Sequence, residues 1–216
     1  MAITILHPIR ARINNQCRML ECLISDFSSM QLQWNKIVEQ QLGEISKVIA
    51  EGDSCIEDSE FSQMRNWFED GRDYKTHFYN SMLILVYSLY EDMMITIHNE
   101  EFPDNLTEKM PKMSEFCQRK GIILPNNIIN DVEFVYNDVR LLRNYITHCK
   151  WGRKENLPED IKHIEKLIER YADIYSDNDS LYLTGTTFLL DVLKKEYGIL
   201  IELTSKLGYI NKISHS

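Results

Sequence analysis

Apolar residues recur at steps of three and four along most of the chain, which is the spacing that places them on one face of an α-helix. The first such stretch runs from about residue 9 to residue 50, and Ser28 and Ser29 mark a point where it could bend or split. A second helix enters at Phe61, with Asp58 or Ser59 as its cap. The pattern therefore predicts an all-α protein.

Gly71 interrupts the second pattern, and the segment from about residue 73 to residue 98 that follows is the most apolar part of the chain. It is apolar on nearly every side, which predicts a central helix enclosed by its neighbours. Glu91 and Asp92 then require polar partners or an exit to solvent, because an unpaired buried charge is costly. The aromatic residues at helical spacing, Trp34, Trp67, Tyr87 and Tyr90, are expected to pack in the core.

Glycines and prolines divide the second half of the chain into further helices. A short helix ends at Gly121, Pro125 opens a long helix that runs to about residue 149, and Pro158 sits near the first turn of the next. A polar turn at 177–179 leads into a strand-like segment at 181–184, and Thr184 or Thr186 could cap a last helix over about 187–207. No repeat or flexible linker divides the chain, so we expect a helical bundle at 57–216 with an N-terminal helical extension at 1–56, the two forming one compact unit.

Composition sets further limits on the class of protein. The chain has 216 residues, 44% of them hydrophobic, with 8 Gly and 5 Pro, which excludes a collagen-like or disordered chain. A net charge of −9 argues against general electrostatic capture of nucleic acid or an anionic membrane. The 5 cysteines include no C-x-x-C pair, and no apolar run is long enough to cross a bilayer. We expect no metal, no cofactor and a reducing cytoplasm.

One locally basic strip stands out in this acidic chain. Between Asp138 and Glu155 there is no carboxylate. The strip could complement the C-terminal dipole of its own helix, or it could attract phosphate locally. Signatures of phosphate loops, dinucleotide-binding folds, serine hydrolases and zinc peptidases are absent. The strip contains Arg140, Arg143, His148, Lys150, Arg153 and Lys154.

Arg143 and His148 are separated by four residues, as are Arg72 and His77, so the spacing alone selects neither pair. On an ideal helix, residues five positions apart point about 140° apart with a rise of roughly 7.5 Å. Arg143 and His148 would therefore meet at one phosphate only if the helix unwinds near Thr147, or if a second subunit completes the site.

The context of the Arg143 pair resembles a known family. The segment LLRNYITHCKW, at the end of an amphipathic helix, is similar to the R-N-x-x-x-H form of the R-x4-6-H motif of the HEPN superfamily. The LYSLYED segment of the upstream buried helix and the LYLTG segment before the last helix also resemble bacterial HEPN ribonuclease families. The resemblance covers roughly residues 73 to 207, and the family does not place its motif at Arg72.

The resemblance implies a helical bundle that dimerises, so that two motifs face each other across a cleft. Many members are metal-independent endoribonucleases that use the RNA 2′-hydroxyl as nucleophile. The motif maps onto Arg143, Asn144 and His148 as catalytic residues. Arg143 would bind the scissile phosphate, His148 would move a proton to or from a sugar oxygen, and Asn144 would orient a neighbour or simply be a polar surface residue.

The remaining basic residues are expected to contact RNA: Arg140, Lys150, Arg153 and Lys154 through its phosphates, and Trp151 either by stacking on a base or by packing on the helix end. Glu91 or Asp92 could buttress the motif. The other histidines, His7, His98, His163 and His215, are expected in surface or satisfied core positions.

The first hypothesis is therefore a homodimeric ribonuclease that acts as a toxin or a phage-defence effector. A second is a non-catalytic interaction module that binds a partner protein, such as a nucleotidyltransferase-type antitoxin, or a nucleotide. A helical scaffold with an accidental motif remains a third.

Overall fold

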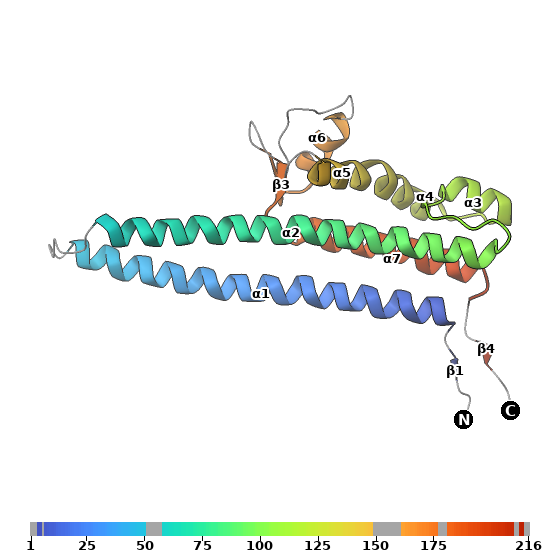
Figure 1. Cartoon of the computed structure of the whole chain (residues 1–216), viewed down its shortest axis with the longest axis horizontal. Helices are drawn as coiled ribbons and strands as arrows, with labels where there is room; N and C mark the ends of the chain where they lie inside the picture. Colours follow the sequence, from blue (N-terminus) through green and yellow to red (C-terminus); the bar gives the residue numbers. More distant parts are fainter. Residues whose placement is uncertain are drawn as a thin grey trace.

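A computed structural model describes residues 4–5, 7–50, 58–148, 161–176, 181–209 and 212–213. Within them the chain is almost entirely helical, which confirms the all-α fold expected from the sequence. Two long helices, α1 (Pro8–Ala50) and α2 (Asp58–Glu101), run side by side, and α7 (Thr187–Lys206) lies behind them and packs on both (Figure 1). The remaining helices lie on the side of α2 away from α1 (Figure 1), where α5 packs on α2 and α4 packs on α7.

Helix α1 is continuous through Ser28 and Ser29, so the bend considered there does not divide it. The Ser29 hydroxyl donates to the carbonyl of Ser25 one turn earlier, which satisfies the side chain without breaking the helix. The inward face of the first half of α1 belongs to the same core as α2 and α7, and it carries Ile9, Ile13, Cys17, Leu20 and Ile24. The predicted boundary between residues 56 and 57 falls at the edge of residues 51–57, which lie outside the described parts.

Helix α2 passes through Gly71 without a break, so the predicted interruption is wrong. A single glycine costs a helix only about 1 kcal/mol relative to alanine, which the rest of a 44-residue helix can absorb. Its second half is the buried central helix that the pattern predicts, and Tyr87 and Tyr90 lie in the core. Trp34 was expected there too but is 42% exposed on α1. The side chain of Trp67 is outside the described residues.

The short helix α3 (Met113–Lys120) ends as predicted at Gly121, which adopts a left-handed conformation with φ 65°. The long helix predicted after Pro125 is one helical run, but it is not regular. It consists of α4 (Asn126–Glu133), a π-helical turn η1 (Phe134–Val139) and α5 (Arg140–His148). The wider π turn shifts the register of the side chains, and Phe134, Val135 and Val139 are all buried.

Helix α6 (Ile161–Arg170) leads into a small antiparallel hairpin of β2 (Ile174–Ser176) and β3 (Leu181–Leu183). The predicted strand-like segment is therefore a strand, and its partner β2 was not foreseen. The pairing of β1 (Thr4–Ile5) with β4 (Lys212–Ile213), which brings together two segments far apart in the sequence, was not predicted either. Pro158 and the turn at 177–179 lie outside the described residues.

The cap of α7 differs from the prediction. Thr186 is the residue before the helix, but its side chain makes no capping hydrogen bond. The carboxylate of Asp173, just before the hairpin, accepts a hydrogen bond from the backbone N–H of Phe188 at 2.9 Å instead. A search of the described residues for a helix long and apolar enough to cross a membrane finds none.

Candidate functional site

Arg143 lies on the face of α5 that packs against α2, and 24% of its side chain is exposed. Its Nη1 donates a hydrogen bond to Oδ1 of Asn144 at 2.9 Å. Its Nη2 is 3.8 Å from Oε2 of Glu91 on α2. The structure thus brings together two of the predicted catalytic residues and the carboxylate that the sequence considered as a buttress.

Tyr87 forms the floor of this site. The guanidinium of Arg143 lies 5.4 Å from the centre of its ring, within the range of a cation–π contact. The Tyr87 hydroxyl is buried, and among the described residues neither it nor Nε of Arg143 has a hydrogen-bond partner. Burial, followed by the charge of Glu91, raises the pKa of Tyr87, while Arg140 and Arg143 oppose that rise. Tyr87 is therefore neutral at physiological pH and acts as a platform.

His148 is the last residue of α5, and only its backbone is described. The helix does not unwind before it: Thr147 is helical, and its hydroxyl donates to the carbonyl of Arg143 at 2.7 Å. On a regular helix the two motif residues then point about 140° apart. The described part of α5 therefore shows no unwinding near Thr147 that would bring Arg143 and His148 to one phosphate.

Arg140 turns back toward the π turn. Its Nε donates to the carbonyl of Tyr136 at 3.1 Å, and its guanidinium lies 4.4 Å from the centre of the Tyr136 ring. Its charge also reaches Tyr87, where it lowers the pKa. Arg140 is therefore positioned next to the site rather than in it. The other residues predicted to contact RNA, Lys150, Trp151, Arg153 and Lys154, lie outside the described residues.

One polar pair near the motif was missed from the sequence. Nδ1 of His163 on α6 lies 2.7 Å from Oδ1 of Asp138 in the π turn. The two residues are 25 positions apart, and no local pattern connects them. This contact ties α6 to the helix that carries the motif.

The expectation of a satisfied or surface position holds for His163 and for buried His98, whose Nδ1 lies 3.4 Å from Oδ1 of Asn99. His7 differs: its ring stacks on Tyr209, but its buried Nδ1 has no hydrogen-bond partner among the described residues, and His215 lies outside them. A search of the described residues for a group of three or more side chains that could hold a metal ion finds none.

Glu91 and Asp92 both have the polar partners that the sequence required. Asp92 accepts a hydrogen bond from Nη2 of Arg12 on α1 at 2.8 Å. Adjacent carboxylates on α2 therefore face different neighbours, Glu91 toward the motif helix and Asp92 toward α1. The sequence could not assign these partners, because they are 52 and 80 residues away.

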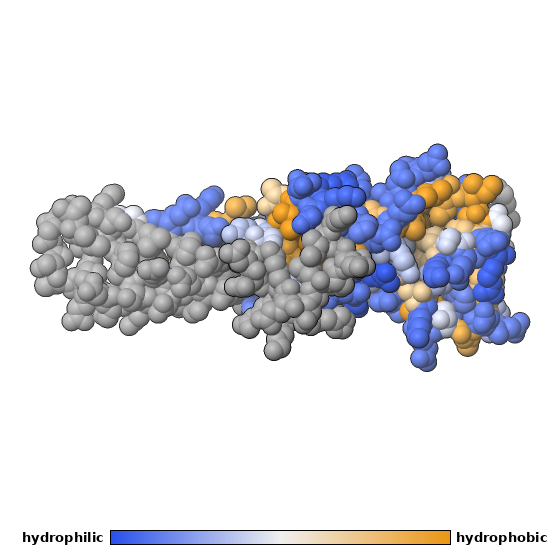
Figure 2. Space-filling view, turned by 90° about the horizontal axis from the view of Figure 1, so that it is seen from above, coloured by the Kyte–Doolittle hydropathy of each residue, from blue (hydrophilic) through white to orange (hydrophobic). Residues whose placement is uncertain are grey.

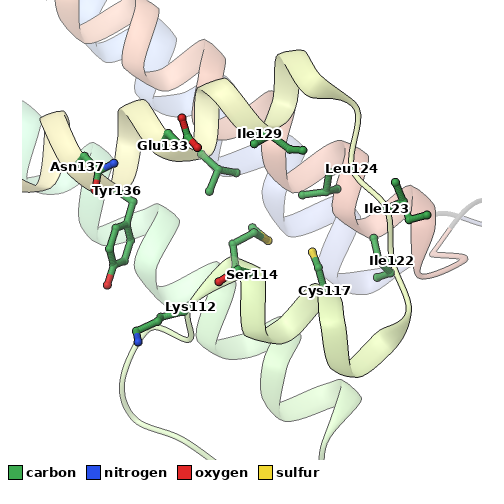
Figure 3. Close-up of a pocket in the computed structure, with 12 residues that line it drawn as sticks. Lys112, Ser114, Cys117, Ile122, Ile123, Leu124, Ile129, Glu133, Tyr136 and Asn137 are labelled. Carbon is green, nitrogen blue, oxygen red and sulfur yellow. The ribbon is translucent and has the colours of Figure 1, made fainter.

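A second feature is an apolar groove between α3 and the α4–η1 helix, with a volume of about 510 Å³. Figure 3 shows Ile122, Leu124, Ile129 and Cys117 around the space between the two helices. Ile123, at its mouth, is 85% exposed. Figure 2 shows apolar surface gathered toward this end of the molecule. The groove shares no lining residue with the Arg143 site, and its mostly apolar lining includes the charged residues Lys112 and Glu133.

Comparisons with protein-family models, with curated proteins and with solved structures find no match for the chain.

Proposed function

We propose that the protein is a metal-independent endoribonuclease of the HEPN type, and that it acts as a toxin or phage-defence effector. The observation that carries this proposal is the setting of Arg143. A partly exposed guanidinium lies near the C-terminal end of an amphipathic helix, hydrogen-bonded to Asn144 and 5.4 Å from the centre of the Tyr87 ring. The assignment to HEPN rests on the motif and its position in the chain.

In this proposal Arg143 binds the scissile phosphate. A guanidinium offers several N–H donors in a plane, and it stabilises the negative charge that grows on the phosphate oxygens during attack. Asn144 holds Nη1 through its side-chain oxygen, which fixes the plane of the guanidinium. His148 handles a proton on a sugar oxygen, since an imidazole titrates near neutral pH.

In this proposal a homodimer brings Arg143 and His148 to the same phosphate. Because α5 stays helical to His148, one copy of the motif does not bring the two side chains to the same phosphate. Two copies facing each other across a cleft would place Arg143 of one protomer near His148 of the other. The proposed active form is therefore a dimer with RNA between its two motif helices.

The experiment is cleavage of total bacterial RNA in the presence of a chelator, with a light-scattering mass for each protein. We expect the wild type to cleave as a dimer, and Arg143→Ala and His148→Ala to be inactive dimers of unchanged helicity. Arg72→Ala and His77→Ala, the matched pair at the same spacing, should keep full activity. Strict dependence on a divalent ion, or loss of activity in the Arg72 and His77 variants instead, would contradict the proposal.

The apolar groove favours a second candidate function, an interaction module that docks a partner protein. A large exposed apolar side chain such as Ile123, beside a groove of this size, is typical of a surface that binds a partner rather than of one that faces only solvent. Absence of cleavage by the wild type, together with capture of a partner that Ile123→Glu abolishes, would support this function over the ribonuclease.

A further inference from the structure

Arg140 and Tyr136 form a stacked pair about one turn before Arg143 on the same helical run. The guanidinium of Arg140 lies 4.4 Å from the centre of the Tyr136 ring, and both side chains are half-buried, so part of each faces solvent. Among the described residues no carboxylate pairs with Arg140, whereas Arg12 and Arg143 each have one within 4 Å. The charge of Arg140 is therefore not neutralised by a neighbour in the described part of the chain.

The π turn holds this pair together. In a regular α-helix the carbonyl of Tyr136 would accept the backbone N–H of Arg140, four residues later. In the π turn that N–H donates to the carbonyl of Val135 instead, five residues earlier. The Tyr136 carbonyl accepts a hydrogen bond from Nε of the Arg140 side chain at 3.1 Å, and this bond keeps the guanidinium over the ring. Irregular turns of this kind often occur at functional sites.

The pair also lies close to the arginine that is proposed to bind the scissile phosphate. Residues three apart in a helix differ by a rise of about 4.5 Å and point about 60° apart, so Arg140 and Arg143 share one side of α5. Burial raises the pKa of Tyr87, and the charges of both arginines oppose that rise, which places both near its hydroxyl. A nucleotide that puts its phosphate on Arg143 therefore brings its base close to Arg140.

Resting on the proposed ribonuclease function, we propose that the Arg140–Tyr136 pair is a base-stacking subsite for a nucleotide next to the scissile phosphate. A guanidinium is planar and weakly hydrated, so it stacks on a nucleobase while it keeps its charge. Tyr136 supports the guanidinium from the other side, and the base, Arg140 and Tyr136 form a stack of three layers. The subsite tolerates different bases, because each base has a face that can stack.

Two observations favour a base over a second phosphate at Arg140. The edge of the guanidinium that includes Nε is already used by the Tyr136 carbonyl, which leaves fewer donors for a bidentate phosphate contact. Figure 3 shows Tyr136 at the end of the apolar groove away from Ile122 and Ile123, so the ring does not belong to the apolar end of that surface. Tyr87, the other ring beside Arg143, is only 1% exposed and cannot receive a base.

The test uses the full chain and a short RNA with one mapped cleavage site. Two matched RNAs carry an abasic ribose on the 5′ or the 3′ side of the scissile phosphate, so the 2′-hydroxyl and every phosphate remain. We expect the wild type to lose about 10-fold in kcat/KM on one of them. Arg140→Lys keeps the charge but not the plane, so it should lose about 10-fold on intact RNA, mainly through KM, and nothing further on that abasic RNA. Tyr136→Leu, which removes the supporting ring, should show the same pattern.

Arg119→Lys is the matched control. The guanidinium of Arg119, on α3, lies 3.8 Å from the centre of the Phe102 ring, so this variant breaks a similar stack away from the motif and should cleave all three RNAs like the wild type.

The inference is overturned if the wild type cleaves both abasic RNAs as well as the intact one. It is also overturned if Arg140→Lys is as active as the wild type on intact RNA, which would indicate a contact through charge alone, or if the losses from Arg140→Lys and from the missing base multiply. A wild type that cleaves none of the RNAs overturns the ribonuclease proposal itself, a result distinct from all of these.

Discussion

The side-chain oxygen of Asn144 accepts a hydrogen bond from Nη1 of Arg143, its neighbour in the sequence, at 2.9 Å. The side chains of adjacent residues in a helix point about 100° apart, so the contact requires the arginine to lie along the helix surface. There its guanidinium has three neighbours, which are the side-chain amide of Asn144, the ring of Tyr87 and the carboxylate of Glu91. A neutral acceptor in this place orients the guanidinium without adding a second negative charge beside that of Glu91.

Replacing this neutral acceptor by a charged one should impair phosphate binding. Asn144→Asp keeps the size of the side chain but pairs Arg143 with a second carboxylate, so an RNA phosphate must compete with it. We expect KM for RNA to rise at least about 10-fold, and the rise to be larger at low salt, where repulsion between Asp and phosphate is less screened. Steady-state cleavage at two salt concentrations measures both effects. An unchanged KM in a folded dimer would show that Asn144 is only a polar surface residue.

Glu101 joins three parts of the fold at the end of α2. It accepts a hydrogen bond from the hydroxyl of Tyr209 at 2.6 Å and pairs with Lys120 at the end of α3. Burial alone would raise its pKa, but the hydrogen bonds from Lys120 and Tyr209 outweigh burial, and the pKa of Glu101 is lowered.

A lowered folded-state pKa makes the contribution of Glu101 depend on pH. The stabilisation is complete above the unfolded value of about 4.3 and is lost as the pH falls through the folded pKa. We expect Glu101→Gln to be less stable than the wild type at pH 7, with the difference shrinking below pH 4. Urea unfolding at pH 7, 4 and 3 measures this, and Glu100→Gln, on the exposed side of the same turn, is the control. A difference that stays constant with pH would contradict the prediction.

Glu196 presents the opposite case in the middle of α7. It is only 2% exposed, and its Oε1 has no hydrogen-bond partner among the described residues. Desolvation by burial raises its pKa well above the usual value. Its charge also contributes, after burial, to the raised pKa of Cys17, about 12.

Because the folded-state pKa of Glu196 is raised, its protonated form favours folding at low pH. This contribution to stability is complete below the unfolded-state pKa of about 4.3, and it declines as the pH rises toward the folded-state pKa. We expect Glu196→Gln, a neutral residue of the same size, to match the wild type near pH 4 and to be more stable near pH 8. Thermal unfolding at the two values compares them. If the difference in melting temperature between Glu196→Gln and the wild type is the same at both pH values, Glu196 does not titrate in this range.

The sequence predicted the helices well and their tertiary contacts poorly, for physical reasons. Periodicity depends on local spacing, so it located α1, the buried half of α2 and the end of α3 at Gly121. The break predicted at Gly71 was wrong, because a glycine weakens a helix without ending it when its neighbours are good helix formers. The π turn before Arg140 was invisible to periodicity, since it depends on how the flanking side chains pack.

In the candidate site too, the local motif was predicted from the sequence and the tertiary contacts were not. The motif that contains Arg143, Asn144 and His148 is contiguous and was found from the sequence. The carboxylate beside it is 52 residues away in the sequence, so its partner could be assigned only from the packing of α2 on α5. The cap of α7 was sought among the threonines next to it, whereas the structure supplies it from Asp173 through the close approach of the hairpin.

Gly185 allows that approach, and its substitution tests it. A Cβ added there would lie 2.8 Å from Cβ of Asp173, closer than carbon atoms pack, and the displaced carboxylate is the one that caps α7 at Phe188. Gly198, inside α7, is the matched control, because a Cβ there meets nothing within 4 Å.

We expect Gly185→Ala to lower the free energy of unfolding by about 1 to 3 kcal/mol, from overpacking together with a weakened cap. Gly198→Ala should instead raise it by about 0.5 to 1 kcal/mol, because alanine loses less backbone entropy in a helix. Asp173→Gly separates the two parts of the first effect, since it removes both the capping carboxylate and the Cβ that Gly185→Ala would meet at 2.8 Å. In that background Gly185→Ala should cost much less than it does alone, and an undiminished cost in the urea unfolding of the double variant would show that Gly185 is required for another reason.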